Sequence, residues 1–174
     1  MHYIKNMQKT LEKQLKRLED NMPFEYTFKE LDIKFDNKSR AFDLKFIVNF
    51  FVVHVHIIYL YDYPFSAPYM LFINLNSAIK HPFLKYDKTV NMCDFSPAID
   101  IKQQIVNCYL IFLEMLNNPE NEDLVELGEV TFPMLEEEVE SFNEMLNNPE
   151  NKDLVEFGDV TFPMLEKEIE SFDL

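Results

Sequence analysis

Residues 46–61 read FIVNFFVVHVHIIYLY and decide the fold class. Val53, Val55 and Ile57 fall on one face of this run if it is extended, because side chains alternate along a strand. A membrane-spanning helix is the alternative, but the run is short for one and Asn49 interrupts it. Its β-branched and aromatic residues favour β-strands. We therefore expect strands here and no membrane span.

His54 and His56 share the opposite face of the same run. Two histidines at this spacing can ligate a metal ion, but no third ligand is near in the sequence, so we expect exposed sheet residues. The two cysteines, Cys93 and Cys108, are too few for a zinc site or a disulfide framework. We predict neither a metal nor a cofactor.

Helices are predicted on both sides of the strand-rich region, residues 24–73. The amino-terminal one ends before Pro23 and places on one face Ile4, Met7, Leu11, Leu15 and Leu18. The second covers residues 101–116, and its apolar stripe contains Ile105, Cys108, Tyr109, Phe112 and Leu116. Cys108 is thus expected in the core. The fold class is α+β: an N-terminal helix, an antiparallel sheet of about four strands, and C-terminal helices.

The chain of 174 residues carries a formal net charge of −15. Such a field repels phosphates, so we expect no nucleic-acid partner and a preference for basic surfaces. The amino end lacks the apolar core of a secretory signal, which favours an intracellular protein.

The carboxyl end contains a tandem duplication. Residues 113–142 recur as 143–172 with only about six differences. We predict a domain at 1–142 and an appended acidic helical copy at 143–174. Only one copy can occupy a given place on the core, so the second packs beside it, exchanges with it, or contacts another molecule, which makes dimerisation through the duplicated tail a prediction.

Four motifs in order resemble those of ubiquitin-conjugating enzymes. YDYPFSAPYMLF at 61–72 resembles their Tyr-Pro-Phe-x-x-Pro segment, and HPF at 81–83 their His-Pro-Asn. FSPAIDI at 95–101 resembles their Trp-Ser-Pro-Ala run, and YLIFLEMLNNPENEDL at 109–124 their second helix and acidic loop, with a leaning toward the neddylation branch. The resemblance covers roughly residues 5–142.

This resemblance implies an α+β sandwich of the ubiquitin-conjugating type. In the family a cysteine thiolate accepts the carboxyl terminus of ubiquitin, or of a ubiquitin-like protein, from an activating enzyme. The thioester then passes to a lysine with the help of a ligase. A thiol suits this chemistry because it is nucleophilic near neutral pH and its thioester stays reactive toward amines.

The site departs from the family pattern although His81 and Pro82 are retained. Counting from His81, the family's nucleophile position is occupied by Asn91, and Cys93 comes two residues later. A carboxamide forms no thioester. The family's Asn after His-Pro supports an oxyanion, whereas Phe83 has no polar hydrogen to offer. The family's Gly-rich hairpin before the stretch that corresponds to residues 49–65 is also missing.

The resemblance also assigns partner surfaces. Phe65 in one loop and Pro97 with Ala98 in another match the positions where ligases dock. Lys9 and Lys13 on the first helix match positions that meet the activating enzyme. The alternatives are core packing for Phe65, turn formation for Pro97 and Ala98, and a solvated face for the lysines.

Three functional hypotheses follow. The first is a variant that has lost thioester chemistry and acts as a binding module. The second is an active enzyme with Cys93 as nucleophile and Asp123 orienting the lysine; Asp123 otherwise reads as a solvated loop carboxylate, and Asp94 beside Cys93 discourages the thiolate. The third is an acidic interaction protein unrelated to conjugation. The pathway implies a cytoplasmic or nuclear location.

Overall fold

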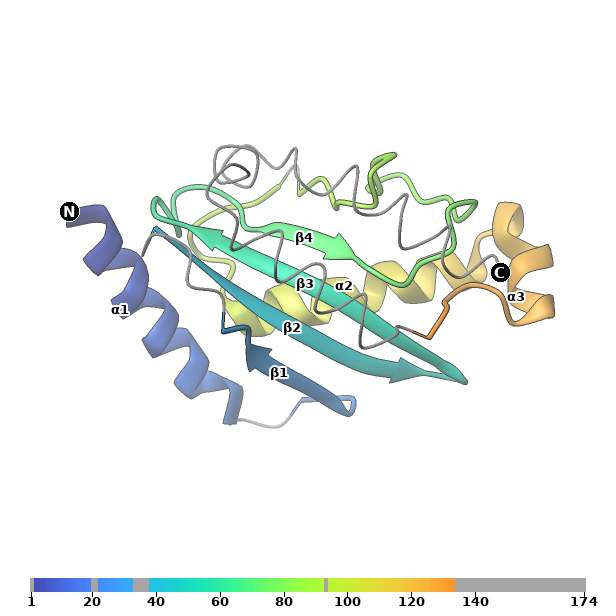
Figure 1. Ribbon diagram of the computed structural model, residues 1–174, viewed down its shortest axis with the longest axis horizontal. Coiled ribbons are helices and arrows are strands. Elements are labelled where there is room, and N and C mark those ends of the chain that lie inside the picture. The colour runs from blue at the N-terminus through green and yellow to red at the C-terminus, as the bar shows by residue number, and fades with distance from the viewer. Residues whose placement is uncertain (1, 20–21, 33–37, 93, 134–174) are drawn as a thin grey trace.

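A four-stranded antiparallel sheet forms the centre of the computed structural model, which describes residues 2–19, 22–32, 38–92 and 94–133. The strand order is β1-β2-β3-β4. Helix α2 crosses behind the sheet, and α1 and α3 lie at its two ends (Figure 1). The predicted α+β fold class is confirmed. The elements are α1 His2–Lys16, the 3₁₀ helix η1 Arg17–Glu19, β1 Tyr26–Glu30, β2 Ser39–Val48, β3 Phe51–Leu60, β4 Tyr69–Phe72, α2 Ile101–Asn117, the 3₁₀ helix η2 Pro119–Asn121 and α3 Glu122–Leu127.

Residues 46–60 form the end of β2, a tight turn and β3, and Tyr61 begins the next turn, so the prediction of strands is confirmed. Val48 pairs with Phe51, which leaves a two-residue turn in which Asn49 has a φ of 57°. Asparagine tolerates this left-handed conformation better than most residues, and it closes the hairpin without glycine. No helix in the described ranges is both long and apolar enough to cross a membrane.

The histidine face of β3 differs from the expectation of exposed side chains. His56 is 2% exposed, and its Nε2 lies 3.5 Å from Asp43 Oδ1 on β2. His54 is half-buried. Burial, which disfavours the charged imidazole, lowers the pKa of His56 and brings that of His54 down to about 4. The expectation of exposure was wrong for His56 because the periodicity of one strand cannot show what covers its second face.

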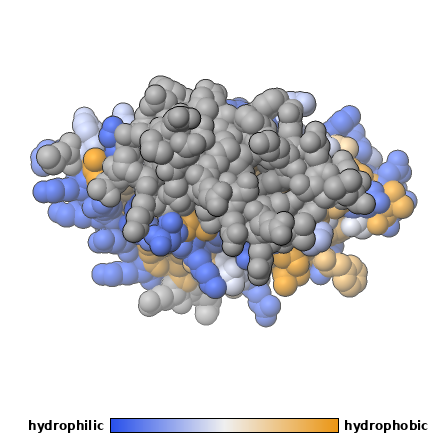
Figure 2. Space-filling model, viewed as in Figure 1, coloured by the Kyte–Doolittle hydropathy of each residue, from blue (hydrophilic) through white to orange (hydrophobic). Residues whose placement is uncertain are grey.

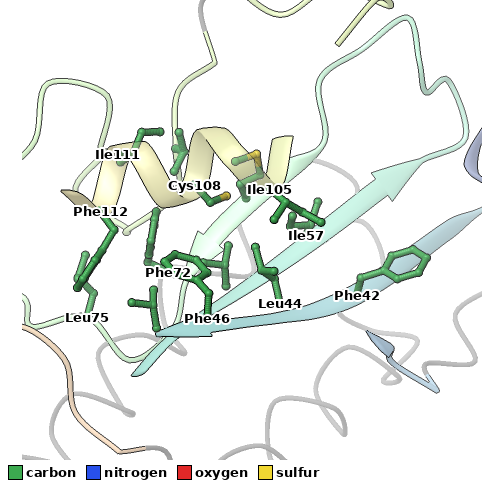
Figure 3. Packing of buried hydrophobic residues seen from close by; sticks show 14 of the residues in the cluster. Phe42, Leu44, Phe46, Ile57, Phe72, Leu75, Ile105, Cys108, Ile111 and Phe112 are labelled. Atoms are coloured by element: carbon green, nitrogen blue, oxygen red, sulfur yellow. The ribbon is translucent and has the colours of Figure 1, made fainter. Parts of the chain in front are cut away.

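The core lies between the sheet and α2. Ile105 and Cys108 point from the helix toward side chains of the strands, among them Leu44 and Ile57 (Figure 3). All four side chains are fully buried, and burying an aliphatic side chain of this size stabilises the fold by about 1.5–3 kcal/mol. The prediction that Cys108 belongs to the core is confirmed.

Local signals set the ends of α2 and position α1. Asp100 caps α2 by accepting a hydrogen bond from the Gln103 N–H at 3.0 Å. Arg17, directly after α1, lies 3.8 Å from the Asp100 carboxylate. Met7 and Leu11 are fully buried, as the predicted apolar face requires. The amino-terminal helix is thus packed against the start of α2, which brings the two helices to the loops described next.

Candidate functional site

His81 is held in one orientation by both of its ring nitrogens. Its Nδ1 accepts the Phe83 N–H at 3.0 Å, and its Nε2 lies 2.6 Å from Glu114 Oε2 on α2. Because a backbone N–H can only donate, Nδ1 carries no proton, and the Nε2–H donates to the carboxylate. The imidazole, whose side chain is 3% exposed, therefore connects the His-Pro turn to α2.

Residues 83–91 form a short hairpin that places Asn91 opposite Phe83. The Asn91 N–H donates to the Phe83 carbonyl at 2.7 Å, and the Lys85 N–H donates to the Thr89 carbonyl at 2.9 Å. At the tip, Lys88 has a φ of 68°. Asn91 is exposed. The two positions that depart from the family pattern are thus neighbours across one hairpin.

A pocket of about 230 Å³ lies between this hairpin, the start of β4 and α2. Its walls are mainly apolar, and its polar members are Asn91, Asp94, Asn107 and Glu114. Cys93 lies outside the described residues, but its chain neighbours Met92 and Asp94 both line the pocket. The described lining residues offer carboxylates and carboxamides, which bind through hydrogen bonds and charge but form no thioester.

Cys108 is not part of this pocket. It is fully buried in the core, and burial raises the pKa of its thiol well above the usual value. A neutral, inaccessible thiol is a poor nucleophile. Of the two cysteines in the sequence, Cys93 alone is a candidate nucleophile.

Two exposed loops carry the residues matched to ligase docking. Phe65, in the turn after β3, is 70% exposed, and Pro97 and Ala98, before α2, are exposed. The two loops contact each other through the rings of Tyr63 and Phe95, whose centroids lie 6.4 Å apart. Core packing is thus excluded for Phe65. The structure brings these three predicted residues to neighbouring loops, and their role in docking stays a prediction.

A buried polar network fixes these loops to the helices. The Tyr63 hydroxyl donates to Gln14 of α1 and accepts from Gln104 of α2 at 3.0 Å. The Tyr59 hydroxyl donates to Gln104 Oε1 at 2.6 Å, and Gln14 Oε1 also accepts the Ile101 N–H at 3.2 Å. Burial raises the pKa of both tyrosines, so both hydroxyls stay protonated. The network joins α1, the Phe65 loop and α2 in one rigid unit.

Sequence reasoning missed Gln14, Gln104 and Glu114. A signal exists for the glutamines, because each is a polar residue at a buried helical position, Gln14 beside Leu11 and Gln104 beside Ile105. Such residues require buried partners. Glu114 carried no signal, since its partner His81 is 33 residues away in the sequence.

The remaining predicted residues lie apart from the pocket. Lys9 and Lys13 are exposed on α1, on the helix that contributes Gln14 to the network. Asp123 is exposed in the first turn of α3 and does not line the pocket. Within the described ranges no three His, Cys, Asp or Glu side chains come together as metal ligands. The second repeat and the boundary at 142–143 lie outside the described residues.

A second hollow, of about 810 Å³, lies between the β2–β3 turn and the end of α3. Hydrophobic side chains are exposed at both places (Figure 2). Phe50 is 98% exposed and Leu127 is 69% exposed. None of the candidate catalytic or partner-binding residues named from the sequence lines this hollow.

Comparison with known proteins supports the fold alone. No family model and no curated protein sequence matches the chain. Among solved structures it is similar to S. cerevisiae Ubc12, with a TM-score of 0.53 and 22% sequence identity over 70% of this chain and 70% of that one. Together with the helix and sheet order above, this shows that the chain has the fold of ubiquitin-conjugating enzymes.

Proposed function

We propose that this protein is a non-catalytic member of a ubiquitin or ubiquitin-like conjugation pathway, of the neddylation type, and acts there as a binding module. The observation that carries the proposal is the hairpin in which Asn91 pairs with Phe83. It supports the alignment that puts a carboxamide where the family has its thiol. The pathway places its action in the cytoplasm or the nucleus.

Each residue of the site supports binding better than acyl transfer. Asn91 cannot form a thioester, and the side chain of Phe83 supplies no donor to an oxyanion, while its backbone N–H is already donated to His81. Both nitrogens of His81 are occupied by Phe83 and Glu114, so the imidazole has no nitrogen left to act as a base. What remains is a mainly apolar pocket with acidic side chains in its wall.

Exposed residues on a loop and on α1 support the partner surfaces of this proposal. Phe65 stands exposed on a loop anchored by Tyr63, which suits an apolar pocket on a ligase domain. Lys9 and Lys13 give the activating enzyme a basic helix on an otherwise acidic chain. A protein that binds these partners without carrying the modifier would sequester them or hold them together.

Catalysis through Cys93 is the alternative. It is favoured by one observation, that Met92 and Asp94 on either side of Cys93 line the pocket. The negative charge of Asp94 opposes it, because a neighbouring carboxylate raises the cost of forming the thiolate. Under this alternative the pocket would hold the thioester.

A thioester assay distinguishes the two proposals. The protein is incubated with activating enzyme, ATP and either ubiquitin or the neddylation modifier, and is then run on a non-reducing gel. We expect no thiol-sensitive adduct from the wild type, Cys93→Ser or Cys108→Ser. An adduct that Cys93→Ser abolishes and Cys108→Ser leaves unchanged would establish the enzyme instead.

Binding is tested separately by NMR titration with ubiquitin, the neddylation modifier and ligase domains. We expect at least one to shift resonances, and the ligase-induced shifts to be lost in Phe65→Ala. Tyr86→Ala is the matched control, since Tyr86 is an aromatic residue at 81% exposure outside the two docking loops. Silence from every partner would contradict the binding module.

A further inference from the structure

The backbone N–H and carbonyl of Lys80 are held by two asparagines of the first repeat. Asn121, which is fully buried, accepts the Lys80 N–H through Oδ1 at 2.9 Å and donates through Nδ2 to the Lys80 carbonyl at 2.8 Å. The same Nδ2 donates to the Met115 carbonyl at 3.0 Å. Asn118 Nδ2 also donates to the Lys80 carbonyl, at 3.3 Å. These side chains attach the start of the repeat to the domain.

A second set of contacts attaches the end of the repeat. The Val130 carbonyl accepts the Asn76 N–H at 2.8 Å, and the Phe132 N–H donates to the Asn74 carbonyl at 2.8 Å. The Val130 side chain is fully buried in the core. Between the two sets, Gly128 ends α3 with a φ of 72°, a conformation that glycine adopts without strain. Residues 118–133 thus occupy a defined docking site.

The second copy carries the same docking residues thirty positions later. Those that correspond to the contacts above are Met145, Asn148, Asn151, Gly158, Val160 and Phe162. Within the docked part the copies differ at positions 122, 127 and 129, where the first copy has exposed side chains. Glu129 contributes only its carbonyl, which accepts from Asn76 Nδ2 at 2.9 Å, so its change to Asp159 keeps that contact. None of the described hydrogen bonds that hold residues 118–133 uses a side chain that differs between the copies.

We propose that residues 148–163 of the second copy are an alternative occupant of the docking site of residues 118–133, in the same chain. Exchange at the junction after Asn117 loops out one repeat length, 118–147, and leaves α2 intact. The entropic cost of the loop grows only with the logarithm of its length. The first copy needs no such loop, so the state in which it is docked is favoured over the exchanged state by about 10²-fold. The second copy docks when the first cannot.

The occupant comes from the same chain because of the tether. Tethering in one chain gives a segment an effective concentration on the order of a millimolar, above that of a second molecule in solution. Docking of the second copy releases residues 118–147 as an acidic segment. The duplication thus lets either of two segments of the same chain complete the domain. The inference does not depend on the proposed pathway function.

The test uses three full-length variants and equilibrium unfolding in urea. In Val130→Asp the second copy rescues the fold, so the folding constant falls only by the loop cost of about 10²-fold. Val160→Asp alone leaves it within about twofold. In the double variant, Val130→Asp with Val160→Asp, neither copy can dock without burying a carboxylate, so the folding constant falls by about 10³–10⁴-fold. A Val130→Asp variant as unstable as the double variant would overturn the proposal.

Hydrogen exchange followed by mass spectrometry reports the exchange directly. The repeats give peptides of different mass because positions 122, 127 and 129 differ between copies. In Val130→Asp we expect the backbone amides of residues 118–133 to lose protection from exchange and those of residues 148–163 to gain it, in a monomer. The milder pair Asn121→Ala and Asn151→Ala repeats the comparison if the aspartate variants unfold. Unprotected residues 148–163, or protection found only in a dimer by light scattering, would contradict exchange within one chain.

Discussion

Four buried polar side chains, Gln14, Tyr59, Tyr63 and Gln104, decide how the predicted partner surface is held. The hydrogen bonds in this group each join a donor to a suitable acceptor, and they offset the cost of removing these atoms from water. Three parts of the chain far apart in sequence meet there. The loop that bears Phe65 is therefore rigid at its base although it is exposed at its tip.

Gln104→Ala removes the central member of this network. It leaves the Tyr59 hydroxyl buried without its acceptor, and we expect a loss of about 2–3 kcal/mol in the free energy of unfolding. Gln103→Ala is the control, because Gln103 is exposed one position earlier on α2, and we expect a change within about 0.5 kcal/mol. Urea unfolding measures both. Equal losses would mean that the network contributes no stability.

His54 makes stability depend on pH. Its folded pKa of about 4 lies below the ordinary value of 6.5, so the unfolded chain binds a proton more readily as the pH falls through this window. Stability from this group is complete above pH 6.5, declines toward pH 4 and is lost below it. Burial of His56 acts in the same direction.

We expect His54→Gln to reduce the loss of unfolding free energy between pH 7 and pH 5 by about 1–2 kcal/mol, because the substituted side chain does not titrate. Urea unfolding of both proteins at the two pH values measures the difference. His2→Gln is the control, since His2 is exposed near the start of α1. A wild-type slope retained in His54→Gln would show that His54 is not buried in solution.

At the scale of elements, the sequence predicts whatever local periodicity determines. The faces of α1 and α2, the strands in residues 46–61 and the burial of Cys108 all follow from spacing within one segment. The burial of His56, the His81–Glu114 contact and the glutamine network depend on which segments meet, and one-dimensional patterns do not contain that information. The pairing of Asn91 with Phe83 could be approached only through motif spacing.

The β2–β3 turn is the element that most depends on one backbone conformation. Asn49→Ala removes the polar side chain that lets asparagine adopt a φ of 57°, and we expect it to lower the free energy of unfolding by about 1 kcal/mol. Asn49→Gly relieves the steric restriction, and we expect it to stay within about 0.5 kcal/mol of the wild type. Phe50→Ala, at the fully exposed neighbour, is the control. Thermal unfolding of the three variants ranks them, and an Asn49→Ala variant as stable as the control would contradict the left-handed conformation.

At the scale of the whole molecule, a fold shared with S. cerevisiae Ubc12 at 22% identity is combined with an altered site and a duplicated end. The order of the motifs predicted this fold because each motif marks a junction between elements: the turn after β3, the hairpin after β4 and the start of α2. The net charge of −15 gives the whole chain a preference for basic partners. Whether the chain can carry a modifier depends, on the present interpretation, on the carboxamide at position 91.

The most direct test of that claim moves the thiol. Asn91→Cys combined with Cys93→Ser moves the thiol to the position that pairs with Phe83 and leaves Cys108, which is buried, as the other cysteine. The wild type is the matched control. After incubation with activating enzyme, ATP and the neddylation modifier or ubiquitin, intact-mass measurement detects the thioester. We predict an adduct on the double variant and none on the wild type. A wild type that is charged, and that loses its adduct in Cys93→Ser, would contradict the account.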